Sequence, residues 1–400
     1  MKAYPAPFWL LILTMAIVAC VESRSTAAIR TAAPQVTGSA TAVPSLARTS
    51  TPTGLPSPSP TASLSTVVLP VCQQPSQVEF GELTLAFAAN WDGDGEIYKV
   101  QADGSGLVQL THNTTDETGP KWSPDGHQLA FVSDLDRTPM FMVSDADGSD
   151  SAIIASGLEV SFDLVWSPTG QQIVFRRVND LAVVDVQTGE EVNLTPRRPF
   201  LGPGLPSFGP EGDRMVFVGV MPDSAGPPSD RLFTVRVDGT ELTELSFPIG
   251  DADWPMWHPV RDEILFQGVV QGEGYGLFVA TLGGSITRLK PEHRYLTLPS
   301  WSPDGTMLAY VALESEPGTW LHVATENEEV DERVLEPEVG RGIYRFFWAP
   351  DSRHIAYTVT NETRGFGTAD IFVFDICEGV RKLVVEAVSQ FSDLSWRPLP

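Results

Sequence analysis

One sequence motif recurs along the chain and limits the folds that the chain can adopt. It is an aromatic anchor residue, a Ser-Pro-Asp-Gly turn and an apolar strand, clearest at residues 122–134, WSPDGHQLAFVSD. Further copies begin at Trp166, Phe208, Trp257, Trp301 and Trp348, and a last fragment begins at Trp396. Successive anchors lie 42 to 49 residues apart. A period in the forties that is made of short strands is typical of β-propeller blades and not of a helical solenoid.

Each repeat contains the signals of four strands. The order is anchor strand, tight turn, apolar strand, loop, second apolar strand, second tight turn and polar strand. The second turn is Asp103-Gly104 in the first repeat and Asp147-Gly148 in the next. This dipeptide favours a hairpin because both of its positions tolerate positive φ. The sequence therefore predicts an all-β fold, a single propeller of four-stranded blades.

The number of blades follows from the apolar second strands. They begin at Leu83, Gln128, Gln171, Arg214, Glu263, Met307 and His354. The first of these seven strands has no anchor strand before it, and residues 391–397 supply the missing one. We therefore favour seven blades in a ring closed by strands from both ends of the chain, which removes exposed sheet edges. A ring of six or eight blades is the alternative, because the fourth repeat is rich in Gly and Pro.

The first twenty residues have the pattern of an export signal. Lys2 precedes an apolar run over 8–18, which is too short to span a bilayer. The run ends in Ile17-Val18-Ala19-Cys20, which resembles a bacterial lipobox, where the signal is cut before the cysteine and the thiol is acylated. We expect a signal peptide over 1–19 and a lipidated Cys20 that anchors the protein outside the cytoplasm. The alternative is an ordinary signal peptide with a chance cysteine.

Residues 20–70 differ in composition from residues 71–400. The first stretch is dominated by Ser, Thr, Ala and Pro, as in TSTPTGLPSPSPTASLST, and has little apolar surface to bury. Such a segment stays disordered, with a mean span on the order of 40 Å for about fifty residues, and its hydroxyls are candidates for glycosylation. We expect a linker that holds a propeller, residues 71–400, away from a membrane.

Two further cysteines, Cys72 and Cys377, flank the repeat region. An even pair of thiols in an exported protein favours a disulfide. Such a bond would close a loop of about 300 residues and reinforce the ring. The alternative is two free cysteines that lie too far apart to bond, since sequence alone gives no geometry.

The phrase WSPDG-x-x-[LI]-[AV]-[FY], with Ile-Tyr or Leu-Phe in the next strand, resembles the TolB-like (WD40-like) propeller repeat. The resemblance covers about residues 80–400 and implies the fold, whereas function depends on sites added to a fold. TolB itself has a separate N-terminal domain and is not held by an N-terminal lipid. A Ser/Thr/Pro stretch precedes the repeats here. The resemblance therefore implies a TolB-like lipoprotein other than TolB.

The longer loops between strands indicate where the protein would bind a ligand or partner. Both tight turns of a blade fall on one rim, and the longer loops fall on the other, around the mouth of the central channel. These loops hold candidate binding residues, namely Trp91, Arg197, Arg198, Trp254, Arg294, Tyr295, Arg341, Tyr344 and Arg345, together with the aromatic Phe200. Guanidinium groups bind carboxylates, and the rings offer stacking faces. The alternative is that the arginines pair with loop acids such as Asp251 and Glu292 while the aromatics pack onto the blades.

Signals for catalysis and metal binding are weak. Asp92, Asp94 and Glu96 alternate in WDGDGE, a partial calcium-loop pattern that also suits an ordinary polar loop. The sequence has no Gly-x-Ser-x-Gly elbow, no HExxH and no histidine pair with zinc spacing. The best-placed histidine, His293, has no identified partner. We expect no catalytic residue, no metal site and no cofactor.

The net charge of −25 restricts the partners. An acidic surface is repelled by phosphate backbones and anionic headgroups, so we expect no nucleic acid and membrane contact only through the lipid. We expect a monomeric, non-catalytic protein-interaction module of the cell envelope, whose partner is an envelope protein or glycan. The alternatives are a receptor for carbohydrate or small anionic ligands at the channel mouth and, more weakly, a propeller hydrolase or lyase.

Overall fold

A computed structural model describes most of the repeat region. The described residues are 69–73, 78–91, 93–135, 138–156, 164–177, 180–196, 200, 203–222, 229–245, 249–289, 296–313, 319–325, 331–335, 343–360, 368–389 and 393–400. Contacts between residues divide the chain into two units, Met1–Leu64 and Ser65–Pro400. The predicted signal peptide, Cys20 and the linker up to residue 68 lie outside the described residues.

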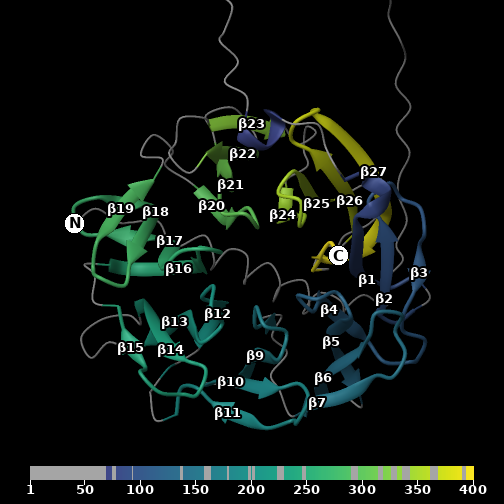
Figure 1. Cartoon of the computed structure of the whole chain (residues 1–400), viewed down its shortest axis with the longest axis horizontal. Helices are drawn as coiled ribbons and strands as arrows, with labels where there is room; N and C mark the ends of the chain where they lie inside the picture. Colours follow the sequence, from purple (N-terminus) through teal and green to yellow (C-terminus); the bar gives the residue numbers. More distant parts are fainter. Residues whose placement is uncertain are drawn as a thin grey trace, which may run out of the picture. The chain divides into compact units, whose positions relative to one another are not determined.

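The described strands form seven four-stranded antiparallel sheets that follow one another around a ring (Figure 1). Each sheet is one blade, and the strand that carries the anchor residue lies innermost. This arrangement confirms the predicted all-β propeller and the count of seven blades. Two short 3-10 helices, η1 (Pro70–Gln73) and η2 (Phe80–Glu82), precede the first strand. Among the described residues, no helix is long and apolar enough to cross a membrane.

Each blade is built from four strands, ordered below from the innermost to the outermost. Blade 1 contains β28 (Ser395–Trp396), β1 (Thr84–Ala89), β2 (Glu96–Gln101) and β3 (Val108–Gln109). Blade 2 contains β4 (Glu117–Trp122), β5 (Gln128–Leu135), β6 (Thr138–Asp145) and β7 (Ala152–Ser156). Blade 3 contains β8 (Val165–Trp166), β9 (Gln172–Arg177), β10 (Asp180–Asp185) and β11 (Glu191–Asn193). Blade 4 contains β12 (Pro203–Phe208), β13 (Arg214–Met221), β14 (Ser229–Arg236) and β15 (Thr243–Glu244).

The remaining three blades have the same order. Blade 5 contains β16 (Ile249–Trp257), β17 (Glu263–Val270), β18 (Gly274–Thr281) and β19 (Ile286–Leu289). Blade 6 contains β20 (Leu296–Trp301), β21 (Met307–Leu313), β22 (Thr319–Thr325) and β23 (Asp331–Leu335). Blade 7 contains β24 (Ile343–Trp348), β25 (His354–Thr360), β26 (Thr368–Asp375) and β27 (Val380–Ser389).

Blade 1 takes its strands from both ends of the repeat region. β28 pairs antiparallel with β1, with Trp396 opposite Leu85 and Ser395 opposite Ala86. The N–H of Arg397 extends this pairing by donating to the carbonyl of Thr84 at 2.8 Å. The C-terminal strand therefore completes the blade that begins at β1, as the missing anchor strand predicted.

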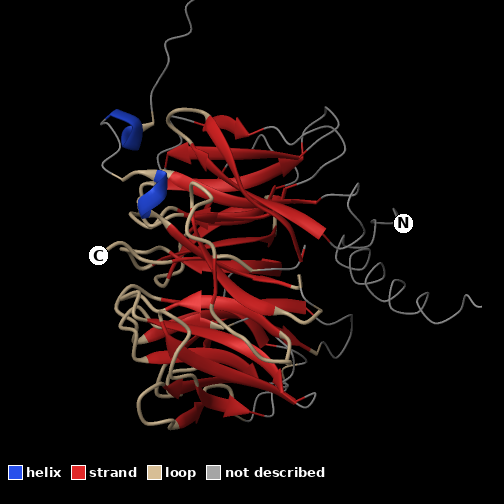
Figure 2. Ribbon diagram, turned by 90° about the vertical axis from the view of Figure 1, so that its right-hand side faces the viewer, coloured by secondary structure: helices blue, strands red, loops and turns tan. Residues whose placement is uncertain are grey.

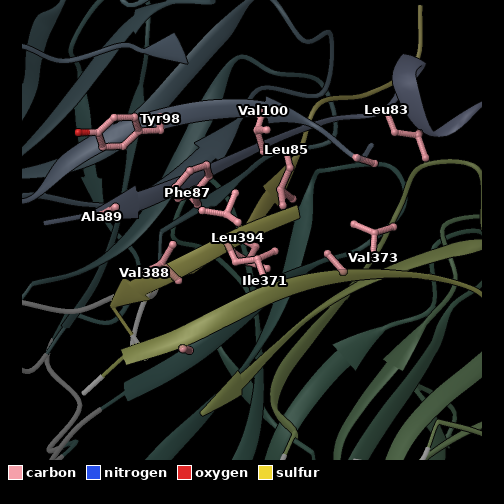
Figure 3. Packing of buried hydrophobic residues seen from close by; sticks show 14 of the residues in the cluster. Leu83, Leu85, Phe87, Ala89, Tyr98, Val100, Ile371, Val373, Val388 and Leu394 are labelled. Atoms are coloured by element: carbon pink, nitrogen blue, oxygen red, sulfur yellow. The ribbon is translucent and has the colours of Figure 1, made fainter. Parts of the chain in front are cut away.

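The hydrophobic core lies between neighbouring sheets. At the junction of blades 7 and 1, Leu85 and Phe87 of β1 face Ile371 and Val373 of β26, and Leu394 fills the space beside them (Figure 3). All five of these side chains are at most 1% exposed. Burial of each is worth about 2–3 kcal/mol, so the ring is held together by apolar contact at its junctions.

The anchor aromatics are buried at these junctions as predicted, and several also donate a hydrogen bond. The indole Nε1 of Trp166 donates to the carbonyl of Lys121 at 3.0 Å, and that of Trp396 donates to Phe347 at 3.1 Å. Trp348 donates in the same way to Ser300 at 3.1 Å. Each acceptor immediately precedes the anchor of the preceding blade. At these three anchors the indole both fills the junction and links it to the neighbouring blade, which a phenylalanine cannot do. The buried Nε1 atoms of Trp122, Trp257 and Trp301 have no hydrogen-bond partner among the described residues.

The segment that leads into the ring is fixed to the last two blades. Leu69 is 2% exposed and packs in a cluster with Val323 of blade 6 and Tyr357 of blade 7. Three residues further on, the structure joins Cys72 to Cys377 in a disulfide with the Cα atoms 5.1 Å apart. Cys377 lies in the turn between β26 and β27, so the bond ties the start of the described chain to blade 7.

A buried ion pair organises that turn. Arg353 contacts Asp375 through Nε and Nη2, with a closest approach of 2.7 Å, and the two side chains are 7% and 3% exposed. Asp375 Oδ1 also accepts the N–H groups of Cys377 and Glu378 at 2.8 and 3.1 Å. Burial disfavours the charge on Asp375, but the hydrogen bonds from Arg353 and these amides outweigh it and lower its pKa. The carboxylate thereby holds the cysteine-bearing turn in place.

Candidate functional site

The two faces of the ring differ in their connections. Strands alternate in direction within a blade, so the first and third connections of each blade fall on one face, here called the turn rim (Figure 2). These are tight turns, closed for example by Gly126 N–H to Ser123 O and by Gly148 N–H to Asp145 O, both at 2.9 Å. The middle connection and the connection to the next blade fall on the opposite face, the loop rim. Of the described candidate residues, Trp91 lies on the loop rim, and Trp254 and Arg345 lie in the innermost strands β16 and β24.

The structure describes only part of the predicted set. The residues outside the described ranges are Arg197, Arg198, Arg294, Tyr295 and Arg341, together with Asp92 and His293. Tyr344 lies in β24, but its side chain is not described. Trp91, Phe200, Trp254 and Arg345 are described, and they occupy different environments. Phe200 is 3% exposed and packs against Phe217 and Phe233 of blade 4, so it is a core residue and does not offer the expected stacking face.

Trp91 packs on blade 1 and reaches blade 7. Its ring lies 4.6 Å from that of Tyr98 and 5.9 Å from that of Phe87, measured between centroids. Its Nε1 donates to the carbonyl of Ala387 in β27 at 3.1 Å. The side chain is still 41% exposed. Trp91 therefore joins two blades and keeps an accessible face on the loop rim.

Arg345 is paired with a carboxylate of the closing strand. Its guanidinium contacts Oδ1 of Asp393, while Lys121 Nζ lies 3.3 Å from Oδ2 of the same residue. Asp393 is 2% exposed, whereas Arg345 and Lys121 are 33% and 23% exposed. The three residues lie on or beside the innermost strands of blades 7, 1 and 2. We call Lys121, Arg345 and Asp393 the seam cluster.

The seam cluster has more positive than negative charge. Two cations share one buried carboxylate, which leaves one positive charge uncompensated within the cluster at neutral pH. The cations keep part of their surface open to solvent, and a second carboxylate there would complete the pairing. Arg345 is paired locally, which was the alternative to ligand binding for the arginines. Its partner is Asp393 and not one of the loop acids.

Trp254 stands at a recurring backbone irregularity. It has φ of 50°, and its N–H donates to Oδ1 of Asp253 at 2.9 Å. Positions three residues before the anchor of other blades share this left-handed conformation, namely Gly119, Leu205 and Leu298, with φ of 62°, 53° and 55°. The strand pairing shifts register at each of these places, which marks a β-bulge. For a residue with a side chain, this left-handed conformation costs on the order of 1–2 kcal/mol. The inner strands are therefore held in a bent conformation.

Carboxylates gather near blades 4 and 5. Burial, together with the negative charge of Asp251, raises the pKa of Asp230 in β14. Burial and the charge of Asp253 raise the pKa of Tyr275 in β18 to about 12. These groups lie at strand ends on the loop rim. The loop rim is thus acidic at blades 4 and 5, whereas the seam cluster lies on or beside the innermost strands of blades 7, 1 and 2.

Sequence reasoning did not identify Lys121 or Asp393. Lys121 directly precedes the anchor Trp122, and Asp393 lies three residues before Trp396, the same offset as Arg345 from Trp348. Aligning the repeats on their anchors would have placed these charged residues on neighbouring inner strands. Among the described residues, no group of three His, Cys, Asp or Glu side chains is arranged to hold a metal ion.

A ring of seven four-stranded blades closed by β28 defines a β-propeller. The family model that matches this chain is the TolB beta propeller domain, over residues 80–261 and 137–399. The chain therefore belongs to the TolB beta propeller domain family.

Curated relatives of the chain have mixed names. A Protein TolB homolog of Chlorobium luteolum is 34% identical over 139 residues, which are 34% of this chain and 31% of that protein. The Uncharacterized peptidase YuxL of Bacillus subtilis is 34% identical over 99 residues, 24% of this chain and 14% of the peptidase. The chain thus spans about a third or less of the length of these relatives.

Solved structures show the same fold with different activities. An oligogalacturonate lyase in complex with manganese has a TM-score of 0.59 at 16% identity, and the match covers 76% of this chain and 84% of the lyase. At that identity the likeness concerns the fold alone. The propeller is shared by proteins named as TolB, as a peptidase and as a lyase.

Proposed function

We propose that the protein is a non-catalytic interaction module of the cell envelope that binds a carboxylate-bearing partner protein at the loop rim. Residues 1–19 serve as a signal peptide, lipidated Cys20 anchors the protein, and residues 20–70 form the linker to a propeller over 71–400. The seam cluster is the observation that supports the binding site most strongly. It presents two partly exposed cations in a chain whose net charge is −25.

The chemistry of the seam cluster favours an anionic group. Arg345 can donate two parallel hydrogen bonds to a carboxylate, and Lys121 adds a point charge from the neighbouring blade. Trp91 offers an exposed ring face on the loop rim. A partner that brings a carboxylate to Arg345 gains a charge-assisted hydrogen bond worth about 1.5–3 kcal/mol.

Capture of the partner by the tagged full chain tests this proposal. The chain is solubilised in mild detergent and used to capture proteins from an extract of the same cell envelope. Arg345→Gln removes the guanidinium but leaves Lys121 to pair with Asp393, so the seam stays closed. Arg214→Met is a matched control, because Arg214 is 35% exposed and pairs with Glu241 on the turn rim. We expect Arg345→Gln to lower capture of a discrete protein about tenfold or more, and the control to retain it. Equal capture by Arg345→Gln and wild type would refute the site.

A receptor for anionic carbohydrate is the second candidate, and the seam cluster also supports it. Sugar carboxylates suit the same two cations, and exposed Trp91 suits a sugar ring. Calorimetric titration of the full chain with oligogalacturonate, and with an uncharged oligosaccharide of equal length, distinguishes the candidates. Binding of the charged sugar alone, lost in Arg345→Gln, would favour the receptor. Turnover of that sugar abolished by a chelator would instead support the hydrolase or lyase alternative.

A further inference from the structure

Two carboxyl groups are buried together where blade 1 meets blade 2 on the loop rim. Glu96 is the first residue of β2 and is 1% exposed, and Glu117 is the first residue of β4 and is 0% exposed. Asn113 bridges them. Its backbone N–H donates to Glu96 Oε1 at 2.9 Å, and its side-chain amide donates to Glu117 Oε2 at 3.0 Å. Both carboxyls therefore lie within reach of one asparagine.

The hydrogen bonds around this pair leave one carboxylate oxygen without a partner among the described residues. Glu117 Oε1 accepts from Ser133 Oγ at 2.8 Å and contacts Thr115 Oγ1 at 2.5 Å. Glu96 Oε2 is buried and has no hydrogen-bond partner among the described residues. A bare carboxylate oxygen in such a place loses its hydration without compensation, whereas a protonated oxygen is neutral.

Charge gives a second reason for a proton at this site. Two ionised carboxylates would place two negative charges in the interior, and within the described ranges no cationic side chain forms an ion pair with either. Burial raises the pKa of Glu117, and the charge of Glu96 adds to that shift. The hydrogen bonds from Thr115, Ser133 and Asn113 oppose the shift without cancelling it. A close pair of buried carboxyls retains one proton well above the pH at which an isolated acid loses it.

We propose that Glu96 and Glu117 share one proton as a pair, and that this proton stabilises the loop-rim junction of blades 1 and 2. The junction is a compact set of contacts. Glu117 N–H donates to Gly95 O at 2.6 Å, and Gly95 N–H donates to Asp116 Oδ1 at 2.7 Å. Loss of the shared proton introduces repulsion between the segments that these bonds join, so the junction loosens as the pH rises.

Other titratable groups lie on the same segments. Asp94 precedes Glu96, Asp116 precedes Glu117, and Asp134 of β5 donates its N–H to Asp116 O at 2.9 Å. The carboxylates of Asp116 and Asp134 are exposed, and the charge that acts on Glu117 is that of the buried Glu96. His112 is exposed at the start of the blade 1 to blade 2 connection and opposes retention when it is protonated. The proton is therefore held by the pair within a mainly acidic surrounding.

The direction of the pH effect follows from linkage. A carboxyl whose pKa is raised by folding binds its proton more tightly in the folded junction than in the open one. Its contribution to stability is fully present below 4.5, the ordinary pKa of glutamic acid, and is lost as the pH rises through the raised value. The junction opens more often by about tenfold for each unit by which the pKa is raised.

Hydrogen–deuterium exchange of the full chain between pH 5 and pH 8 tests the proposal. The readout is protection of peptides covering residues 93–117, corrected for intrinsic exchange with an unstructured reference peptide. Wild type should lose protection as the pH rises. Glu117→Gln keeps the shape and cannot lose a proton, so its protection should not change with pH. Asp134→Asn alters an exposed carboxylate beside Ser133 and should behave as wild type does.

Several outcomes would overturn the proposal. Protection in wild type that does not vary with pH, or that varies equally in Glu117→Gln, would show that no proton is held there. Protection of wild type at pH 8 by millimolar Ca²⁺ would show that the pair holds a cation instead. If Glu117→Gln does not fold, Glu96→Gln tests the same pair from the other strand, and a pH dependence identical to wild type would refute the proposal.

Discussion

Removing the closing strand is the perturbation that tests the architecture most severely. Deletion of residues 393–400 removes β28 and leaves the inner edge of β1 unpaired. Loss of Leu394, which is 1% exposed, costs about 2–4 kcal/mol, and loss of the partly buried Trp396 costs about 2 kcal/mol more. The lost hydrogen bonds between β28 and β1 add about 1 kcal/mol each. The sum, on the order of 5–8 kcal/mol, is comparable with the whole stability of a typical domain.

Urea unfolding of the full chain, followed by circular dichroism and tryptophan fluorescence, measures this loss. Leu394→Ala is the reference variant, because it creates a cavity of the same side chain while the ring stays closed. We expect the deletion to unfold most of the protein without denaturant, while Leu394→Ala shifts the free energy of unfolding by about 2–4 kcal/mol. A deletion variant no less stable than Leu394→Ala would refute closure by β28.

Three further outcomes are expected. Peptide mapping without reductant should find Cys72 joined to Cys377, and Cys377→Ser should lower the free energy of unfolding by about 2–4 kcal/mol; free thiols at both positions would contradict this. Arg353→Met should cost about 3–5 kcal/mol because it leaves the buried Asp375 carboxylate without its guanidinium partner. Since the pKa of Asp375 is lowered by folding, this cost should be present at neutral pH and disappear as the pH falls through that lowered value. Cys20→Ala should move the protein from the membrane fraction to the soluble fraction, and retention in membranes would argue against the lipid anchor.

The fold could be predicted from the sequence because the same strand and turn pattern recurs in several repeats. Anchor spacing, the Asp-Gly turns and the apolar second strands each gave the same four-stranded unit, and the unit without an anchor strand indicated closure by residues near Trp396. Agreement among local signals of this kind is what makes a topology predictable.

The candidate site was less predictable, because loop composition does not reveal pairing. Arg345 was identified from its charge and position, but its partner Asp393 is 48 residues away in sequence and belongs to the segment that closes the ring. Lys121 was missed because a single lysine before an anchor has no local signal. The strained conformation of Trp254 depends on a β-bulge, and the sequence around residue 254 does not indicate one.

The central claim is that the protein binds its partner through the loop rim beside the seam. Photo-crosslinking in intact cells tests it most directly, with a photoreactive phenylalanine in place of Trp91 in one variant and in place of Val192 in another. The two positions are similarly exposed, at 41% and 39%, but Val192 lies in β11, the outermost strand of blade 3. We predict a discrete adduct from position 91 that is lost when Arg345 is also replaced by glutamine, and none from position 192. An adduct from position 192 alone, or one from position 91 that persists in the absence of Arg345, would contradict the account.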